Sequence, residues 1–127
     1  MLREAVQRHL AQPFVPGVSD CATLFADAVL AMTGFDPIAD GRDYATLQDA
    51  LRNIRRAGHR TMADLVAARF REIHPSEAQR GDLGMLADAE IGAITSPLVM
   101  LGADAATKSL AGPVIVSRGL IVRAFAV

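Results

Sequence analysis

The sequence predicts an α+β fold, in which N-terminal helices pack on a C-terminal antiparallel sheet. Apolar residues recur at helical spacing up to about residue 80. Beyond that point the apolar runs are short, rich in β-branched residues and separated by glycine and proline. Hydrophobic residues make up 51% of the chain, and neither an internal repeat nor a low-complexity linker divides it. We therefore expect one domain over residues 1–127.

Four helices are expected in the first part of the chain. The first runs from Leu2 to Ala11 and ends before Pro13. The second begins at a Ser19-Asp20 cap and ends before Gly34. Threonine followed three residues later by aspartate predicts the start of two more helices. Their expected inward stripes are Leu47, Ala50, Leu51 and Ile54 in the third helix, and Met62, Leu65, Val66 and Phe70 in the fourth.

Five strands are expected after these helices, near residues 83–87, 97–101, 105–109, 113–117 and 120–126. Ser117-Arg118-Gly119 predicts a hairpin that joins the last two strands. If the apolar C-terminal run from Val114 to Val127 forms a sheet edge, it offers a pairing surface to a neighbouring chain.

Two short motifs have simple structural interpretations. Arg80-Gly81-Asp82 resembles an adhesion motif, but its glycine also suits a turn into the first strand, which we expect instead. The third helix ends in a basic cluster, for which we expect a solvated face that complements the helix dipole. Contact with phosphate or an acidic partner is the alternative. The cluster comprises Arg52, Arg55, Arg56, His59 and Arg60.

Charge and cysteine content exclude several classes of protein. With 13 Lys plus Arg, 14 Asp plus Glu and a formal net charge of −1, the chain has no basic footprint for nucleic acid. One cysteine forms no internal disulfide, and with three widely spaced histidines it matches no metal-site spacing, so no metal or cofactor is expected. The N-terminus is charged and amphipathic, not a signal peptide, and no apolar run approaches a membrane span. We therefore expect synthesis in the cytoplasm.

The single cysteine, Cys21, has two interpretations. On a helical wheel it shares a face with Leu24, Phe25, Ala28, Val29 and Met32, which suits a small core residue. It also lies in the first turn of a helix, where a thiol pKa can be lowered. A thiolate nucleophile still needs a base, usually histidine. His9, His59 and His74 are each expected in solvent, and His74 is the best candidate to reach Cys21.

The order of these motifs resembles the NlpC-type, papain-like cell-wall peptidases. In those enzymes an Asp-Cys pair, here Asp20-Cys21, begins a helix, and a Gly-Asp-hydrophobic element, here Gly81-Asp82-Leu83, begins the sheet. The chain resembles more closely a group of short phage and prophage proteins related to that superfamily. The shared elements are Thr33-Gly34-Phe35-Asp36-Pro37 after the cysteine helix and Arg123-Ala124-Phe125 in the last strand. The resemblance covers residues 13–127 and implies an NlpC/papain-like fold.

The resemblance also assigns positions to catalytic residues. It implies that Cys21 corresponds to the nucleophile and that the strand Leu98–Gly102 corresponds to the end of the histidine strand. Counting back from Gly102 places Ser96 where the family has its catalytic histidine, and the third polar residue falls near 107–109. Ser96 cannot act as the base, so we expect a degenerate active site.

Members of the phage group are typically encoded among tail-tip genes. The resemblance therefore implies a structural or assembly component of the tail tip of a phage or phage-derived particle, located in the virion tail. Its partners would be tail hub and distal tail proteins. The alternative is an active cysteine peptidase or amidase that cleaves peptidoglycan stem peptides, with Cys21 as nucleophile and His74 as base. A small cytoplasmic domain with another role is also left open.

Overall fold

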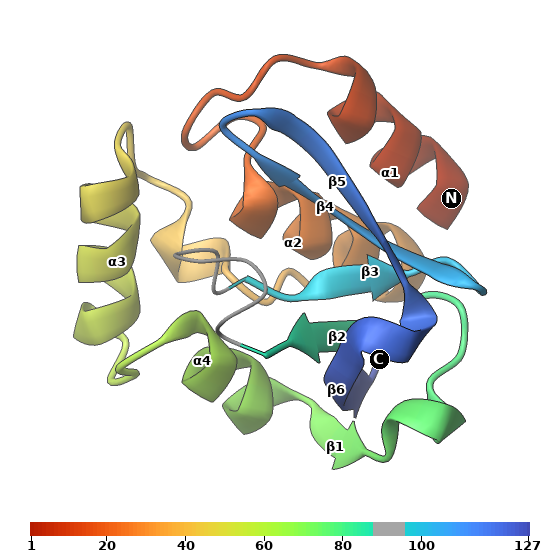
Figure 1. Cartoon of the computed structure of the whole chain (residues 1–127). Helices are drawn as coiled ribbons and strands as arrows, with labels where there is room; N and C mark the ends of the chain where they lie inside the picture. The colour runs from red at the N-terminus through yellow and green to blue at the C-terminus, as the bar shows by residue number, and fades with distance from the viewer. Residues whose placement is uncertain (88–95) are drawn as a thin grey trace.

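A curled antiparallel sheet packs against helices in the computed structural model, which describes residues 1–87 and 96–127 (Figure 1). The helices are α1 (Leu2–Ala11), α2 (Cys21–Thr33), α3 (Leu47–Arg56) and α4 (Met62–Arg69). The strands are β1 (Arg71–Ile73), β2 (Leu83–Leu86), β3 (Leu98–Met100), β4 (Asp104–Ser109), β5 (Gly112–Ser117) and β6 (Ile121–Ala126). Three 3-10 turns connect them: η1 (Ala39–Gly41), η2 (Pro75–Glu77) and η3 (Arg118–Leu120). The predicted α+β architecture is confirmed.

Side-chain caps explain why the helix boundaries could be predicted from the sequence. Asp20 caps α2 by accepting from the Thr23 backbone N–H at 2.8 Å, and Thr23 Oγ1 accepts from the Asp20 backbone N–H at 2.7 Å. Gly34 ends α2 in the left-handed conformation. Thr46 and Thr61 cap α3 and α4. Within the described residues, no helix has the length and apolar character of a membrane span.

The strand order is β1-β6-β2-β3-β4-β5, and every neighbouring pair is antiparallel. The predicted hairpin at residues 117–119 is therefore wrong, because β5 pairs with β4 whereas β6 pairs with β1 and β2. Arg118 redirects the chain there by donating to the carbonyls of Gly102 at 3.3 Å, Pro75 at 3.0 Å and Ala78. The C-terminal strand β6 is consequently internal, and the sheet edges are β5 and the unpredicted β1.

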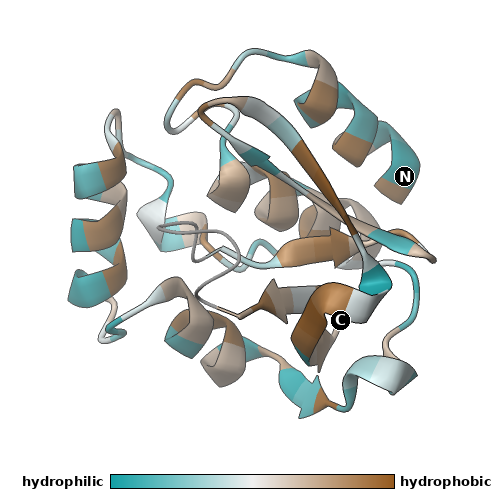
Figure 2. Cartoon of the chain, viewed as in Figure 1, coloured by the Kyte–Doolittle hydropathy of each residue, from teal (hydrophilic) through white to brown (hydrophobic). Residues whose placement is uncertain are grey.

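Apolar residues form two cores, one on each face of the sheet. The first packs the helices against the sheet and includes Leu24, Phe25, Val66, Val99 and Phe125. The second lies on the other face and includes Leu86, Leu98, Met100, Ile121 and Ala124. Figure 2 shows the resulting apolar colour of β2 and β3. Because both faces are covered, β2 and β3 are buried throughout rather than alternating.

The helix α3 departs from the predicted packing. None of its residues is buried, and Leu47 and Leu51 on its apolar stripe are 44% and 39% exposed. Figure 1 shows α3 at one side of the molecule, away from the sheet. Asn53 tethers it by donating to the carbonyls of Gly41 and Asp43, each at 3.2 Å. In α4, by contrast, the inward residues Met62, Leu65 and Val66 are buried as predicted.

The turn before β2 confirms the structural interpretation of Arg80-Gly81-Asp82. Gly81 has a φ of 96°, and a Cβ added there would lie 2.5 Å from Met32 Sδ. Asp82 Oδ1 accepts from the backbone N–H of Val127 at 3.0 Å, which fixes the end of the chain beside the turn.

Candidate functional site

A buried aspartate fixes the start of the cysteine helix. The Asp20 side chain is fully buried, and its Oδ2 accepts from the Gly17 N–H at 2.9 Å and from the Tyr44 hydroxyl at 2.6 Å. Gly17 has a φ of 81°, and a Cβ there would lie 2.1 Å from the Tyr44 carbonyl oxygen, so only glycine fits. Burial raises the pKa of Tyr44, and the hydrogen bond to Asp20 and the negative charge of Asp20 raise this pKa further. These contacts place Cys21 at the first position of α2.

The environment of Cys21 disfavours the thiolate. Burial raises its pKa, and the negative charge of Asp20 acts in the same direction. A hydrogen bond from Ser96 and the backbone N–H groups of Cys21 and Ala22 oppose this shift without overcoming it. The helix N-terminus therefore does not lower the thiol pKa overall, and Cys21 is neutral near pH 7.

Ser96 lies beside the thiol, where the resemblance placed it. It is 5% exposed and lines the same pocket as Cys21, and its hydroxyl acts to lower the pKa of the thiol. A serine hydroxyl can donate to the sulfur but has no proton-accepting nitrogen comparable to imidazole. The thiol thus has a hydrogen-bonding neighbour and no base at this position.

Lys108 lies in the range 107–109 where the resemblance places the third polar residue, but the sequence does not predict its burial or its contacts. It is 1% exposed, and its Nζ donates to Ser19 Oγ at 2.6 Å, to the His9 carbonyl at 2.5 Å and to the Pro13 carbonyl at 3.4 Å. Burial lowers its pKa, and the charge of Asp20 opposes that shift. Three acceptors match the three N–H bonds of an ammonium group, so Lys108 ties β4 to the segment before α2.

The resemblance places the third polar residue of the catalytic set near residues 107–109. Thr107 is fully buried, and its hydroxyl has no hydrogen-bond partner among the described residues. Lys108 and Ser109 both line the pocket over Cys21. The signal that could have revealed Lys108 is its identity as the only lysine in the sequence, within a run of small residues.

The expectation that His9 is solvent-exposed is wrong. His9 is 1% exposed, because it lies on the buried stripe of α1 with Ala5 and Val6. Its Nε2 donates to Asp27 Oδ2 at 2.6 Å, and with a neutral ring its Nδ1 accepts from Ser19 Oγ at 2.9 Å. Burial would raise the pKa of Asp27, but hydrogen bonds from His9 and Arg42 lower it.

The other two histidines have partners of their own. His59 accepts from Arg69 Nη1 at 3.2 Å. His74 is exposed, follows β1 at the sheet edge opposite β5, and accepts from the Ser76 N–H at 3.1 Å in the cap of η2. No histidine is among the described residues that line the pocket over Cys21. The structure therefore does not bring His74 together with Cys21.

Cys21 opens into a pocket of about 510 Å³. Ser96 and Lys108 line it beside the cysteine. The remaining wall is mainly apolar and includes Phe14, Leu47, Leu51, Ile54, Met62 and Leu110. In the described part of the chain, no group of three His, Cys, Asp or Glu side chains could hold a metal ion.

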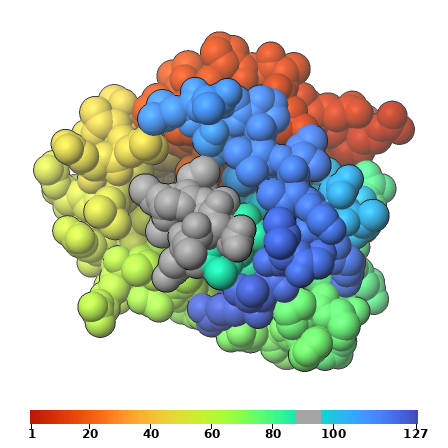
Figure 3. Space-filling view, viewed as in Figure 1, coloured from red at the N-terminus to blue at the C-terminus, as the bar shows by residue number. Residues whose placement is uncertain are grey.

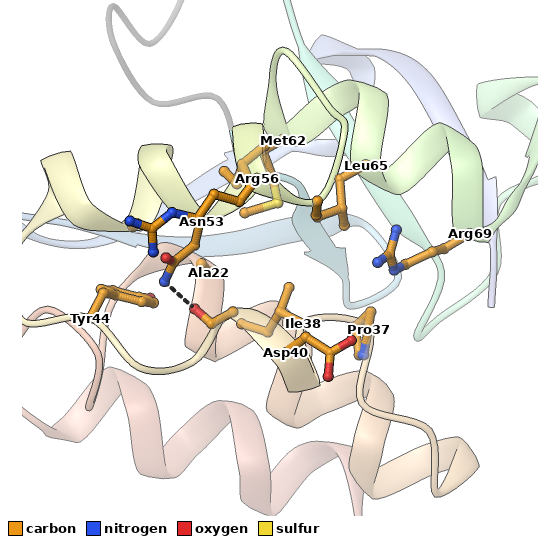
Figure 4. Close-up of a pocket in the computed structure, with 14 residues that line it drawn as sticks. Ala22, Pro37, Ile38, Asp40, Tyr44, Asn53, Arg56, Met62, Leu65 and Arg69 are labelled. Atoms are coloured by element: carbon orange, nitrogen blue, oxygen red, sulfur yellow. Dashed lines mark hydrogen bonds between the residues drawn. The ribbon is translucent and has the colours of Figure 1, made fainter.

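Figure 4 shows a second pocket, of about 360 Å³. It adjoins the first, with which it shares Ala22, Tyr44, Ala50, Ile54 and Met62. Arg56 and Arg69 line this second pocket. We call the two adjoining pockets the α3 groove. Chemically, this groove offers a neutral thiol, a hydroxyl, backbone N–H groups at the start of α2 and an apolar wall, which suit binding better than nucleophilic attack.

The helices packed on a curled antiparallel sheet form an NlpC/P60-like α+β fold. The structure is similar to the "Crystal structure of NlpC/p60 domain of peptidoglycan hydrolase SagA", with a TM-score of 0.62 and 15% sequence identity, covering 99% of this chain and 96% of that one. At this identity the likeness shows the fold alone. The sequence matches over residues 1–127 the family described as "Domain of unknown function (DUF6950)", and the chain belongs to that family. A comparison with curated proteins found no match.

Proposed function

We propose that this protein is a non-hydrolytic NlpC/P60-like domain that serves as a structural component of the tail tip of a phage or phage-derived particle. The observation that carries the non-hydrolytic part is that Ser96, and no histidine, is among the described residues that line the pocket with Cys21. General acid–base help contributes about 10²–10⁴-fold to such reactions, so a thiol without a base is a poor catalyst. The raised pKa of Cys21 lowers its reactivity further.

The tail-tip placement is supported by the motifs shared with short phage proteins. Thr33-Gly34-Phe35-Asp36-Pro37 forms the end of α2 and the turn after it, and Arg123-Ala124-Phe125 lies in β6. Residues of both segments make contacts that stabilise the fold. Asp36 Oδ2 accepts a hydrogen bond from Arg42 Nε at 2.6 Å, and Phe125 is fully buried. In this proposal the partners are tail hub and distal tail proteins, and the protein reaches the virion tail by assembly in the host cytoplasm.

The test combines purified protein with assembled particles. Purified protein should not release peptides from peptidoglycan, and particles carrying Cys21→Ala should contain the protein and infect as the parent does. Cys21→Ser is the matched control, because it keeps a polar atom beside Ser96. Hydrolysis of peptidoglycan that disappears in Cys21→Ala, or absence of the wild-type protein from particles, contradicts the proposal.

A second function, cleavage of peptidoglycan stem peptides, has one observation in its favour. Cys21 is the first residue of α2, and the backbone N–H groups of Cys21 and Ala22 act to lower the pKa of its thiol, as N–H groups that could also stabilise an oxyanion would. With His74 as the base, this enzyme needs η2 to move to the start of α2. Loss of peptidoglycan cleavage in both Cys21→Ala and His74→Ala would establish it.

A further inference from the structure

We propose that the outer edge of β5 pairs with the same strand of a second copy of the chain, giving a two-fold symmetric dimer. This inference goes beyond the proposed function and does not depend on it. The sequence predicts pairing with a neighbouring chain for the run from Val114 to Val127, and within that run the structure leaves only β5 at a sheet edge. The inference is carried by the backbone groups that this edge leaves open and by its lack of charge.

The β4–β5 hairpin determines which backbone groups of β5 point away from β4. Its two-residue turn, Leu110-Ala111, makes Ser109 and Gly112 a hydrogen-bonded pair. Hydrogen-bonded and non-bonded pairs alternate along an antiparallel ladder, so every second residue of β5 directs its N–H and C=O outward. The outward set is Pro113, Ile115 and Ser117. This position suits proline, which has no N–H to donate to β4.

The outward groups form a self-complementary set. Pro113 lacks an N–H, and Ser117, as the N-cap of η3, gives its carbonyl to the first hydrogen bond of that turn. In the described part of the chain, the groups left open are the N–H groups of Ile115 and Ser117 and the carbonyls of Pro113 and Ile115. One copy of β5 therefore offers two donors and two acceptors.

A two-fold axis beside Ile115 pairs all of these groups. Each Ile115 N–H then donates to the Ile115 carbonyl of the other copy, and each Ser117 N–H donates to the Pro113 carbonyl of the other copy. The N–H that Pro113 lacks lies opposite the Ser117 carbonyl that η3 already uses. A strand of ordinary sequence would leave a carbonyl without a donor opposite Pro113 and an N–H without an acceptor opposite Ser117. The match therefore favours a second copy as the partner.

The side chains of β5 suit the same pairing. None of its six residues is charged, so two copies meet without like-charge repulsion. Ile115 is 57% exposed, and in this register the two Ile115 side chains lie opposite each other. On the other face of the ladder, Val114 of one copy lies opposite Val116 of the other, and such β-branched pairs stabilise a sheet. Figure 3 shows the β4–β5 hairpin, in blue, at the surface that faces the viewer.

The opposite edge of the sheet is unsuited to pairing, so the assembly closes at two copies. The strand β1 has three residues, of which Arg71 and Glu72 are charged and exposed. Glu72 also forms an ion pair with Arg123 at 2.9 Å. Shortness and charge are features that protect a strand edge from pairing. One pairing edge in each copy gives a closed dimer rather than a fibre.

The experiment combines analytical ultracentrifugation of the full chain with residue-resolved hydrogen exchange. A six-residue edge buries less than the roughly 1,200 Å² of a standard interface, so we expect a weak dimer with a Kd of about 0.1 mM. Raising the protein concentration from about 50 µM to about 1 mM should then slow exchange of the Ile115 and Ser117 amides about threefold. This slowing assigns the contact to the edge of β5.

Two substitutions at Ser117 isolate the contribution of the edge hydrogen bonds. Ser117 has a φ of −64°, which proline adopts, so Ser117→Pro removes the outward N–H and keeps the strand geometry. Ser117→Ala is the matched control, because both variants lose the hydroxyl that accepts from the Gly119 N–H at 3.3 Å. Ser117→Pro removes two hydrogen bonds from the dimer and should weaken it about tenfold or more, and Ser117→Ala less than about threefold.

A charge placed at the axis gives a second test. Ile115→Lys sets two ammonium groups opposite each other and should weaken the dimer about tenfold or more. Val122→Lys is its control and should leave the Kd unchanged, because Val122 is 54% exposed but lies on the internal strand β6.

Three results would overturn the inference. They are a chain that stays monomeric at about 1 mM, a dimer in which the Ile115 and Ser117 amides exchange as fast as in the monomer, or equal dissociation constants for Ser117→Pro and Ser117→Ala.

Discussion

Replacing Lys108 with methionine should destabilise the fold substantially. The substitution keeps the apolar stem but removes the ammonium group, which donates to Ser19 Oγ at 2.6 Å and to the His9 carbonyl at 2.5 Å. Hydrogen bonds from a charged group contribute about 1.5–3 kcal/mol each, so the two close ones amount to about 3–6 kcal/mol. The variant no longer buries a charge, which returns part of this free energy.

The expected net loss of unfolding free energy is about 2–4 kcal/mol. For a domain of this size, that corresponds to a fall in Tm of about 10 °C. Urea unfolding followed by circular dichroism measures it, with Arg55→Met, an exposed change, as the control expected within about 0.5 kcal/mol. A double-mutant cycle with Ser19→Ala should give a coupling of at least about 1 kcal/mol. If Lys108→Met is as stable as the wild type, the inferred tether does not exist.

Three further predictions concern Cys21, Asp27 and the strand β6. The alkylation rate of Cys21 should rise at a higher pH in the folded protein than in the urea-unfolded protein. The Ser96→His variant should increase the rate at pH 7 about tenfold or more. A pH midpoint of alkylation in the folded protein at or below that of the unfolded protein contradicts the first expectation. The lowered pKa of Asp27 contributes stability that is complete above the unfolded value of about 3.9 and is lost as the pH falls through the folded value. Unfolding at pH 2–6 should therefore show a loss below about pH 4 that Asp27→Asn lacks, and identical profiles would be inconsistent with it. Removing residues 121–127 deletes β6 from between β1 and β2, so the truncated chain should show no cooperative thermal transition; a retained transition would return β6 to the edge role expected from the sequence.

Local chemistry explains which elements could be predicted. The caps Asp20, Thr46 and Thr61 each bond a backbone N–H three residues further along the chain. The starts of α2, α3 and α4 can therefore be predicted from short sequence patterns. The strands β2 to β6 could be located because glycine, proline and apolar runs mark their limits. The pairing of β5 and β6 failed for the opposite reason. Arg118 binds carbonyls about 40 residues away, a contact that no local pattern contains.

In the candidate site, too, local features could be predicted from the sequence and long-range contacts could not. The sequence by itself determined that Cys21 begins a capped helix, and the resemblance to NlpC-type peptidases identified Ser96 as its neighbour. Only the tertiary structure decided the protonation of that thiol, because burial and the charge of Asp20 depend on what packs around it. It also decided that His9 and Lys108 are buried partners of Ser19, since Ser19 and Lys108, 89 positions apart, meet only when β4 packs beside the segment that precedes α2. Periodicity states which side of an element is apolar; the folded chain determines whether that side meets a core, as in α2, or a groove, as in α3.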